Sequence, residues 1–246
     1  MRMSFRGSWN KNLLFLIAAI FIFSACGESS GPQDLLRLSF NKAKQVNSAE
    51  YDIEYITMSI KDSSIRKRHV MAEREITLRR EFFRINITSP DSGEIIYDGK
   101  DFVLLNHLND KAVIPGEDQT PFRMINMFKD VYGMILVRAG DSLNLADTLD
   151  YSIYEGERFN VEGHPCMMVE MKTKDEYFDS ELRYYISKKD TLIRSLENVV
   201  LRKGKRSSYS KYTITNLKTN IDIPGSVFNT EIPEGYEVDE YSGTEK

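Results

Sequence analysis

Apolar and polar residues alternate along most of the chain, and this period of two is the feature that most constrains its fold. Tyr51, Ile53 and Tyr55, for example, alternate with acidic residues. Successive side chains of a β-strand point to opposite faces, so a segment of this kind has one buried and one solvated face. The pattern predicts strands at residues 50–60, 83–88, 95–97, 102–105, 113–114, 151–154, 158–161, 165–173, 181–186, 191–201 and 209–217.

The turns between these segments predict how the strands pair. Asp98-Gly99 separates two apolar runs and is a strong hairpin signal, because both central residues of a two-residue turn need positive φ. The alternation changes phase after Tyr55 and continues through Ile56 and Met58, which predicts a β-bulge. We therefore expect a mainly β (α+β) protein with about ten strands in a strongly curved antiparallel sheet.

The N-terminus has the features of a secretory signal peptide. Three basic residues precede an apolar run at residues 13–23, which is too short to span a bilayer as a helix. Ser24-Ala25-Cys26 follows, and the segment resembles the bacterial lipoprotein signal, which is cut before a cysteine that becomes acylated. This resemblance implies lipidation of Cys26 and stable attachment to a membrane of the bacterial envelope. We expect the outer membrane, on its periplasmic side.

The remaining chain is acidic and has one further cysteine. Removal of the first 25 residues, with three of the 33 basic side chains, leaves 30 basic and 37 acidic residues and a net charge of −7. Nucleic acid is therefore not expected as a partner, because its phosphates require a basic surface. Cys166 is the only cysteine besides Cys26, so no intramolecular disulfide is expected once Cys26 is acylated.

A helix is predicted at the start of the folded domain. Leu36, Phe40 and Ala43 share one helix face within residues 34–46. No linker rich in proline, glycine or serine divides the chain after this helix. The expected organisation is a signal peptide at 1–25, a flexible tether at 26–33 and a single domain at 34–246.

A second helical pattern, at residues 121–137, interrupts the strands. Its apolar face is rich in methionine, whose flexible side chain adapts to varied apolar ligands. The helix is predicted either to pack permanently in the mouth of the barrel or to act as a displaceable lid of a lipid cavity. The candidate residues for binding a hydrophobic ligand are Met124, Met127, Phe128, Val131, Met134 and Ile135.

No group of residues has a catalytic or metal-binding pattern. The G-x-S-x-G match at residues 27–31 lies in the tether, without the strand and helix of a nucleophile elbow. His69, His107 and His164 are far apart and lack metal-ligand spacing. Cys166 has no neighbouring cation and is expected to be an inert, half-buried thiol. We expect no cofactor, no bound metal and no enzymatic activity.

Two basic clusters stand out, at residues 66–68 and 202–206. The second straddles a turn, where cations can prevent strand edges from pairing with other chains. The same cations could instead contact anionic headgroups or an acidic partner, at about 1 kcal/mol each on a membrane. The candidate residues for this contact are Arg202, Lys203, Lys205 and Arg206.

Two motifs resemble the lipoprotein carrier and receptor family of the Lol system (LolA/LolB-like). One is Phe82-Phe83-Arg84-Ile85, followed by Pro90 and Ile96-Tyr97-Asp98-Gly99-Lys100. The other is Val227-Phe228, followed by Ile232-Pro233-Glu234-Gly235-Tyr236-Glu237-Val238. The resemblance covers residues 35–241 and implies a half-open barrel whose apolar concave face, covered by helices, accepts acyl chains.

These observations predict a membrane-anchored envelope lipoprotein that binds an acyl chain or another hydrophobic ligand. Lipoprotein or lipid transport is the expected role, with the ligand, a lipoprotein and the membrane as partners. The alternative is an envelope sensor or assembly subunit whose sheet binds a protein partner and whose interior is filled by side chains.

Overall fold

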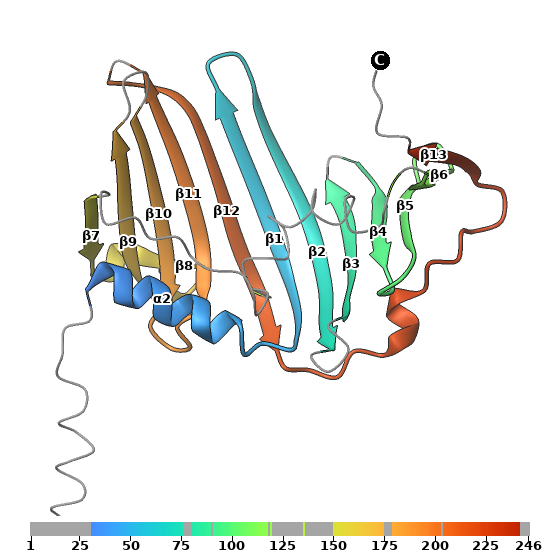
Figure 1. The fold of residues 1–246 in the computed structure, drawn as a ribbon. Helices are drawn as coiled ribbons and strands as arrows, with labels where there is room; N and C mark the ends of the chain where they lie inside the picture. Colours follow the sequence, from blue (N-terminus) through green and yellow to red (C-terminus); the bar gives the residue numbers. More distant parts are fainter. Residues whose placement is uncertain are drawn as a thin grey trace, which may run out of the picture. The chain divides into compact units, whose positions relative to one another are not determined.

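The strands of the chain pair into one continuous sheet (Figure 1). The computed structural model describes residues 31–75, 80–89, 91–117, 119, 135, 150–174, 179–202 and 204–241. From edge to edge the strand order is β13-β6-β5-β4-β3-β2-β1-β12-β11-β10-β9-β7, and β8 pairs with β9. All neighbouring pairs are antiparallel except β13 and β6, which are parallel.

The elements have the following bounds. The helices are α2 (Pro32–Ala43) and the 3-10 turns η1 (Glu157–Phe159) and η2 (Gly225–Phe228). The strands are β1 (Ser48–Ser59), β2 (Ser63–Glu75), β3 (Arg80–Ser89), β4 (Gly93–Tyr97), β5 (Phe102–Asn106), β6 (Lys111–Pro115), β7 (Asp150–Tyr154), β8 (Asn160–Val161), β9 (His164–Lys174), β10 (Asp179–Ser187), β11 (Ile193–Arg202), β12 (Lys205–Thr219) and β13 (Glu237–Tyr241).

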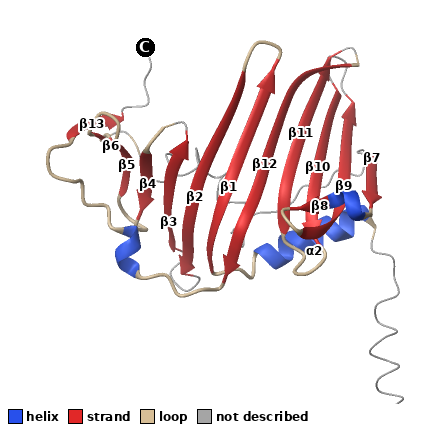
Figure 2. Ribbon diagram, turned by 180° about the vertical axis from the view of Figure 1, so that it is seen from behind, coloured by secondary structure: helices blue, strands red, loops and turns tan. Residues whose placement is uncertain are grey.

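The sheet is curved and does not close into a barrel. Its two edge strands, β7 and β13, are not paired with each other, and both views of the ribbon show the sheet open between them (Figures 1 and 2). The predicted mainly β, half-open architecture is therefore confirmed. The described residues contain thirteen strands rather than about ten.

Helix α2 crosses one face of the sheet, which we call the inner face (Figure 1). Leu36 and Ala43, two of the residues predicted to share a helix face, are buried, and Phe40 is half-buried. Asp34 in the first turn and Lys42 in the last complement the helix dipole. Within the described part of the chain, no helix is long and apolar enough to cross a bilayer.

The other face, which we call the outer face, is covered at one end by the C-terminal segment. Ile96, Val103, Leu105 and Ala112 form a buried cluster on β4, β5 and β6. Ile232 and Tyr236 pack against this cluster. The segment that resembles the end of Lol-family chains therefore buries the apolar outer side of these strands.

Two predictions about local geometry are wrong. Strand β1 stays in register with both neighbours through Tyr55 and Ile56, and the irregularity lies between Glu50 and Asp52. The change of phase in the sequence pattern has another cause. Met58 lies at the exposed end of the β1–β2 hairpin, so its apolar side chain does not mark a buried face of the sheet. In the β4–β5 hairpin only Gly99 has positive φ, because the connection spans four residues, 98–101.

The strand predicted at residues 158–161 is only partly present. The 3-10 turn η1 replaces its first half, and the two residues of β8 form the rest. Phe159 of this turn is buried and lies near the rings of Tyr154 and Tyr185. Burial of one aromatic side chain therefore explains the apolar pattern without an extended strand.

Candidate functional site

The inner face is apolar over the half that lies against α2. Phe40 of α2 contacts both buried clusters of this face, so the apolar surface is continuous. The first cluster consists of Ala43, Val46, Ala49, Tyr51, Ile53, Val70, Ala72, Phe83, Ile85, Ile95, Phe102, Ile135, Leu192 and Ile214. The second consists of Leu35, Leu36, Val169, Met171, Ile186 and Ile193.

Residues that stand opposite one another on neighbouring strands form a row across the sheet. Towards the tips of the longest strands, the rows of the inner face change from apolar to polar. Ile53 stands opposite Ile214 on one side and Arg68 on the other. In the next row Tyr55 lies between Tyr212 and Arg66. The row after that holds Ser210, Thr57 and Ser64.

The tyrosine row marks the boundary between the two halves of the inner face. The rings of Tyr55 and Tyr212 are stacked, with their centroids 4.2 Å apart. The hydroxyls of Thr57 and Ser64, one row further, are joined by a hydrogen bond of 2.7 Å. The inner face is thus amphiphilic along the strand direction: apolar beside α2 and polar towards the tips.

One of the predicted ligand-binding residues belongs to the core of the inner face. Ile135 is fully buried in the first cluster. Met124, Met127, Phe128, Val131 and Met134 lie outside the described residues. The position of Ile135 nevertheless brings one residue of the predicted insert onto the apolar inner face.

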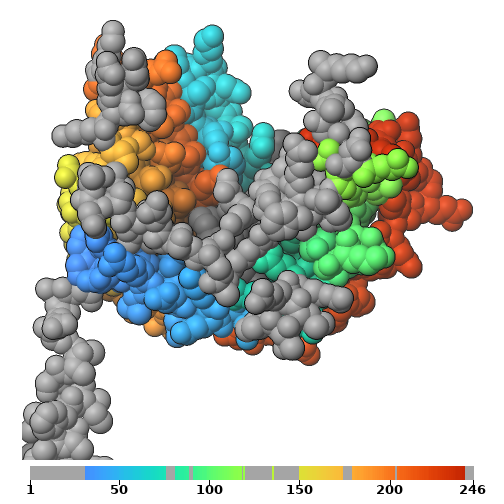
Figure 3. All heavy atoms as spheres, viewed as in Figure 1, coloured from blue at the N-terminus to red at the C-terminus, as the bar shows by residue number. Residues whose placement is uncertain are grey.

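The predicted anionic-surface residues lie at the turn between β11 and β12. Arg202 pairs with Lys205 across this turn, and both are exposed, as is Arg206. Lys203 lies outside the described residues. A hollow of about 600 Å³ separates this turn from the tip of the β1–β2 hairpin. Ile60 at that tip is 82% exposed, and Figure 3 shows the hairpin (cyan) projecting beside the orange strands.

A row of alternating charges crosses the outer face of β9, β10, β11 and β12. Glu170, Arg183, Glu197 and Lys211 lie on successive strands, each opposite the next. Nε of Arg183 donates to Glu170 over 2.9 Å, and Nζ of Lys211 lies 3.3 Å from Glu197. Both carboxylates are buried. Each of the two buried carboxylates therefore has a cationic partner, as a buried charge requires.

Tyrosines cover part of this charged row. Burial, together with the charge of Glu197 and the hydrogen bond to it, raises the pKa of Tyr209 to about 12. Burial likewise raises the pKa of Tyr185, which also hydrogen-bonds to Glu197. Both phenols therefore remain neutral donors to the buried carboxylate at physiological pH.

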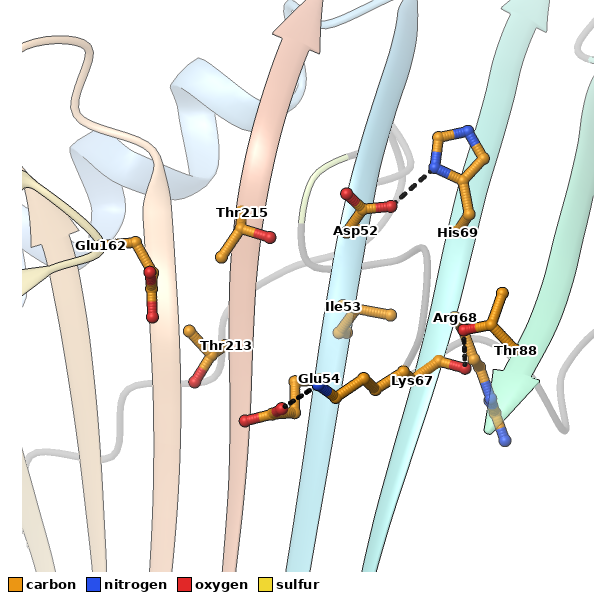
Figure 4. Close-up of a pocket in the computed structure, with 10 residues that line it drawn as sticks. All are labelled: Asp52, Ile53, Glu54, Lys67, Arg68, His69, Thr88, Glu162, Thr213 and Thr215. Atoms are coloured by element: carbon orange, nitrogen blue, oxygen red, sulfur yellow. Dashed lines mark hydrogen bonds and ion pairs between the residues drawn. The ribbon is translucent and has the colours of Figure 1, made fainter. Parts of the chain in front are cut away.

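A second set of polar side chains lines a hollow of about 350 Å³ on the outer face (Figure 4). Nδ1 of His69 lies 2.7 Å from Oδ1 of Asp52, and the amide of Asn216 donates to Oδ2 over 2.7 Å. Burial raises the pKa of Asp52, but the hydrogen bonds from Asn216 and His69 outweigh this and lower it overall. These partners occupy both carboxylate oxygens.

An adjoining hollow of about 740 Å³ brings together residues that are distant in sequence. His69 and His164 both line it, although they lie 95 positions apart in the chain. Glu162, from the β8–β9 turn, has positive φ and lines both hollows. The described residues contain no group of three or more histidine, cysteine, aspartate or glutamate side chains that could hold a metal ion.

Cys166 is more deeply buried than predicted. Its side chain is 1% exposed rather than half-buried, and its Sγ donates to the carbonyl oxygen of His164 over 3.2 Å. Burial raises the pKa of this thiol. The environment therefore opposes thiolate formation.

Strand β2 and two inner-face residues that it carries were not predicted from the sequence. Arg66 and Arg68 were grouped with Lys67 as a basic cluster, but β2 alternates, so Lys67 points to the outer face and the two arginines to the inner face. The signal that identifies them is the period-two series Arg66, Arg68, Val70 and Ala72, whose last two members are buried.

Comparison with known proteins identifies similar folds only. No protein-family model and no curated protein sequence matches the chain. The complex of MucA and MucB from Pseudomonas aeruginosa is similar at 12% identity and a TM-score of 0.49, over 80% of this chain and 60% of that one. Lipoprotein LppX from Mycobacterium tuberculosis is similar at 11% identity and a TM-score of 0.46, over 77% and 94%.

A LolA superfamily protein from Nitrosomonas europaea is also similar, at 13% identity and a TM-score of 0.37, over 81% of this chain and 97% of that one. The chain spans about three fifths of the length of the first chains matched, which come from MucB structures. These likenesses concern the fold. The predicted LolA/LolB-like architecture is confirmed by the open, curved sheet and the helix on its inner face.

Proposed function

We propose that this protein is a lipid-anchored, non-enzymatic lipoprotein of the bacterial envelope that binds an acyl chain or another hydrophobic ligand on its inner face. Its anchor is Cys26, and its site is the outer membrane facing the periplasm. Its role is lipoprotein or lipid transport or localisation. The domain follows the signal peptide and the tether at residues 26–33.

One observation carries this proposal: the open sheet has a continuous apolar inner face, whose two clusters consist of buried residues. Phe40 joins the two clusters of this face, and the edge strands β7 and β13 do not close it. Ligand sites are concave and mostly apolar, with a few polar groups that orient the ligand. The apolar rows beside α2 and the polar rows near the strand tips have this composition.

The insert at residues 121–137 is proposed as the movable wall of the site. Met124, Met127, Phe128, Val131 and Met134 would contact the ligand together with Ile135. The burial of Ile135 in the first cluster supports a place for this segment over the apolar inner face. Methionine-rich surfaces can repack around ligands of different shape.

The alternative is an envelope sensor or assembly subunit that binds a protein partner through its sheet. Strand β13 favours it, because all five of its residues are exposed and it forms one edge of the sheet. Native mass spectrometry of the full-length lipidated protein distinguishes the two functions. A bound species that carries an acyl chain supports the first, and a ligand-free protein in a stable protein complex supports the second.

We also propose that the turn with Arg202, Lys203, Lys205 and Arg206 contacts anionic headgroups. An environment-sensitive dye on Ile60→Cys tests this in reconstituted full-length protein, since Cys26 is expected to be acylated and Cys166 is buried. Anionic lipid is expected to shift the dye emission to the blue. Arg202→Glu with Arg206→Glu should abolish the shift, because each cation contributes about 1 kcal/mol.

The matched control for this labelling is Leu108→Cys, at the β5–β6 turn, where Leu108 is 68% exposed. Its dye is expected to give the same emission with neutral and with anionic vesicles. Equal shifts at positions 60 and 108, or a shift at position 60 that survives both charge reversals, would contradict contact through this turn.

A further inference from the structure

Cations on the two faces of the sheet differ in whether they have a carboxylate partner. On the outer face, Nζ of Lys67 lies 3.3 Å from Glu54, and Nζ of Lys218 lies 3.0 Å from Glu50. Lys211 and Arg183 belong to the charged row described above. These outer cations are therefore neutralised by the protein itself.

Arg66 and Arg68 on the inner face have no such partner. No side-chain hydrogen bond or ion pair joins either guanidinium to a residue of the described segments. Nε of Arg68 is buried and makes no hydrogen bond. A buried N–H without an acceptor destabilises the fold, and more so when it belongs to a charged group. An acceptor from outside the chain would remove this destabilisation.

The surroundings of Arg68 disfavour its positive charge, so a bound anion would stabilise this side chain. Burial lowers its pKa, and the neighbouring charge of Arg66 lowers it further. Two cations side by side with no carboxylate repel each other, so a single anion between them would stabilise both. A guanidinium also offers paired donors that fit a carboxylate or phosphate in a bidentate manner.

Their place in the sheet indicates what the anion is attached to. Arg68 shares its row with Ile53 and Ile87, the last apolar row before the polar half. Towards α2 the next residue of β2 on this face is Val70, which is fully buried. In the other direction the face continues with Ser64 and Thr57. The two arginines thus stand where an apolar surface meets a polar one.

We propose that Arg66 and Arg68 bind the anionic head group of an amphiphile whose acyl chain lies on the apolar rows towards α2. The ligand class is therefore an acyl chain with a carboxylate or phosphate head. Its head faces the strand tips, and its tail faces the helix. This inference deepens the proposed function and rests on it.

Competition between two probes of equal chain length tests the proposal. Full-length protein in detergent is mixed with equal amounts of hexadecanoate and hexadecanol, and native mass spectrometry gives the ratio of the bound forms. The wild type is expected to favour hexadecanoate at least tenfold, because hydrogen bonds to charged groups contribute about 1.5–3 kcal/mol. Arg68→Gln should bring the ratio close to one, and Arg68→Lys should keep part of the preference.

Lys67→Gln is the matched control, since Lys67 lies between the two arginines but pairs with Glu54 on the opposite face. It should leave the ratio unchanged. Arg66→Gln, at an exposed residue, gives a second variant if Arg68→Gln does not fold. Hexadecyl phosphate in place of hexadecanoate shows which head group is preferred, and loss of its preference in Arg68→Gln also supports the proposal.

The outcomes separate this inference from the proposed function. If both probes bind the wild type equally, or if Arg68→Gln and Lys67→Gln have the same ratio, the anionic head site is wrong and the apolar ligand site stands. If neither probe binds at all, the ligand-binding function fails and the head site fails with it.

Discussion

Replacement of Arg183 by methionine is expected to lower the free energy of unfolding by about 3 kcal/mol. Nε of Arg183 lies 2.9 Å from Glu170, and one terminal nitrogen lies 2.6 Å from Glu181. The side chain of Glu170 is only 6% exposed, so loss of the guanidinium leaves a buried carboxylate with a weaker set of partners. Urea denaturation followed by circular dichroism measures the change.

Lys188→Met provides the control for this prediction. Nζ of Lys188 lies 2.8 Å from Glu155, but both side chains are largely exposed, at 42% and 58%. An exposed pair of this kind contributes less than about 1 kcal/mol. If Arg183→Met costs no more than Lys188→Met, the charged row does not stabilise the outer face.

The effect of Arg183→Met should also depend on pH. Burial raises the pKa of Glu170, but hydrogen bonds from Lys172 and Arg183 and their positive charges outweigh it, so the pKa is lower than that of an ordinary glutamate. A lowered carboxyl pKa stabilises the fold above the unfolded value and loses this effect as the pH falls through the folded value. The difference between wild type and variant should therefore narrow below about pH 4.5, the ordinary value.

Replacement of Ile135 by alanine is expected to cost about 3 kcal/mol. Ile135 is fully buried in the first cluster, so truncation leaves a cavity in the largest group of buried residues. Thermal or urea unfolding of the full-length protein measures the loss. The result tests whether the insert belongs to the folded core of the inner face.

Leu38→Ala is the matched control, because Leu38 on α2 is 53% exposed. Its substitution should change the free energy of unfolding by no more than about 0.5 kcal/mol. An Ile135→Ala protein as stable as Leu38→Ala would contradict the placement of residue 135 in the core.

The alternation of side chains was enough to predict most strands of the antiparallel sheet, because each strand with one apolar face carries its own signal. That the sheet stays open was implied only by the resemblance to the Lol family. Strand β2 has no such signal at its start, where Arg66 and Arg68 occupy inner-face positions that other strands fill with apolar residues. A strand with two arginines on its inner face departs from the pattern that identifies strands. For the same reason, the inner-face positions of Arg66 and Arg68 were not predicted from the sequence.

Pairing between strands that are distant in the sequence could not be predicted either. Strand β13 pairs in parallel with β6, and Glu237 stands opposite Lys111, 126 positions earlier. No local turn signal specifies such a pair, and all residues of β13 are exposed, so no burial pattern marks it. The joint hollow of His69 and His164 likewise depends on the strand order, which brings the β8–β9 turn to the outer side of β1 and β2.

The central claim is that the inner face holds an acyl chain, and native mass spectrometry of the full-length protein tests it most directly. The wild type is expected to carry acyl-chain adducts that Met127→Asp and Phe128→Asp lose. Leu108→Asp, the same chemical change at a 68% exposed position, should retain them. A wild-type protein free of adducts, or equal adducts in all three variants, would contradict the claim.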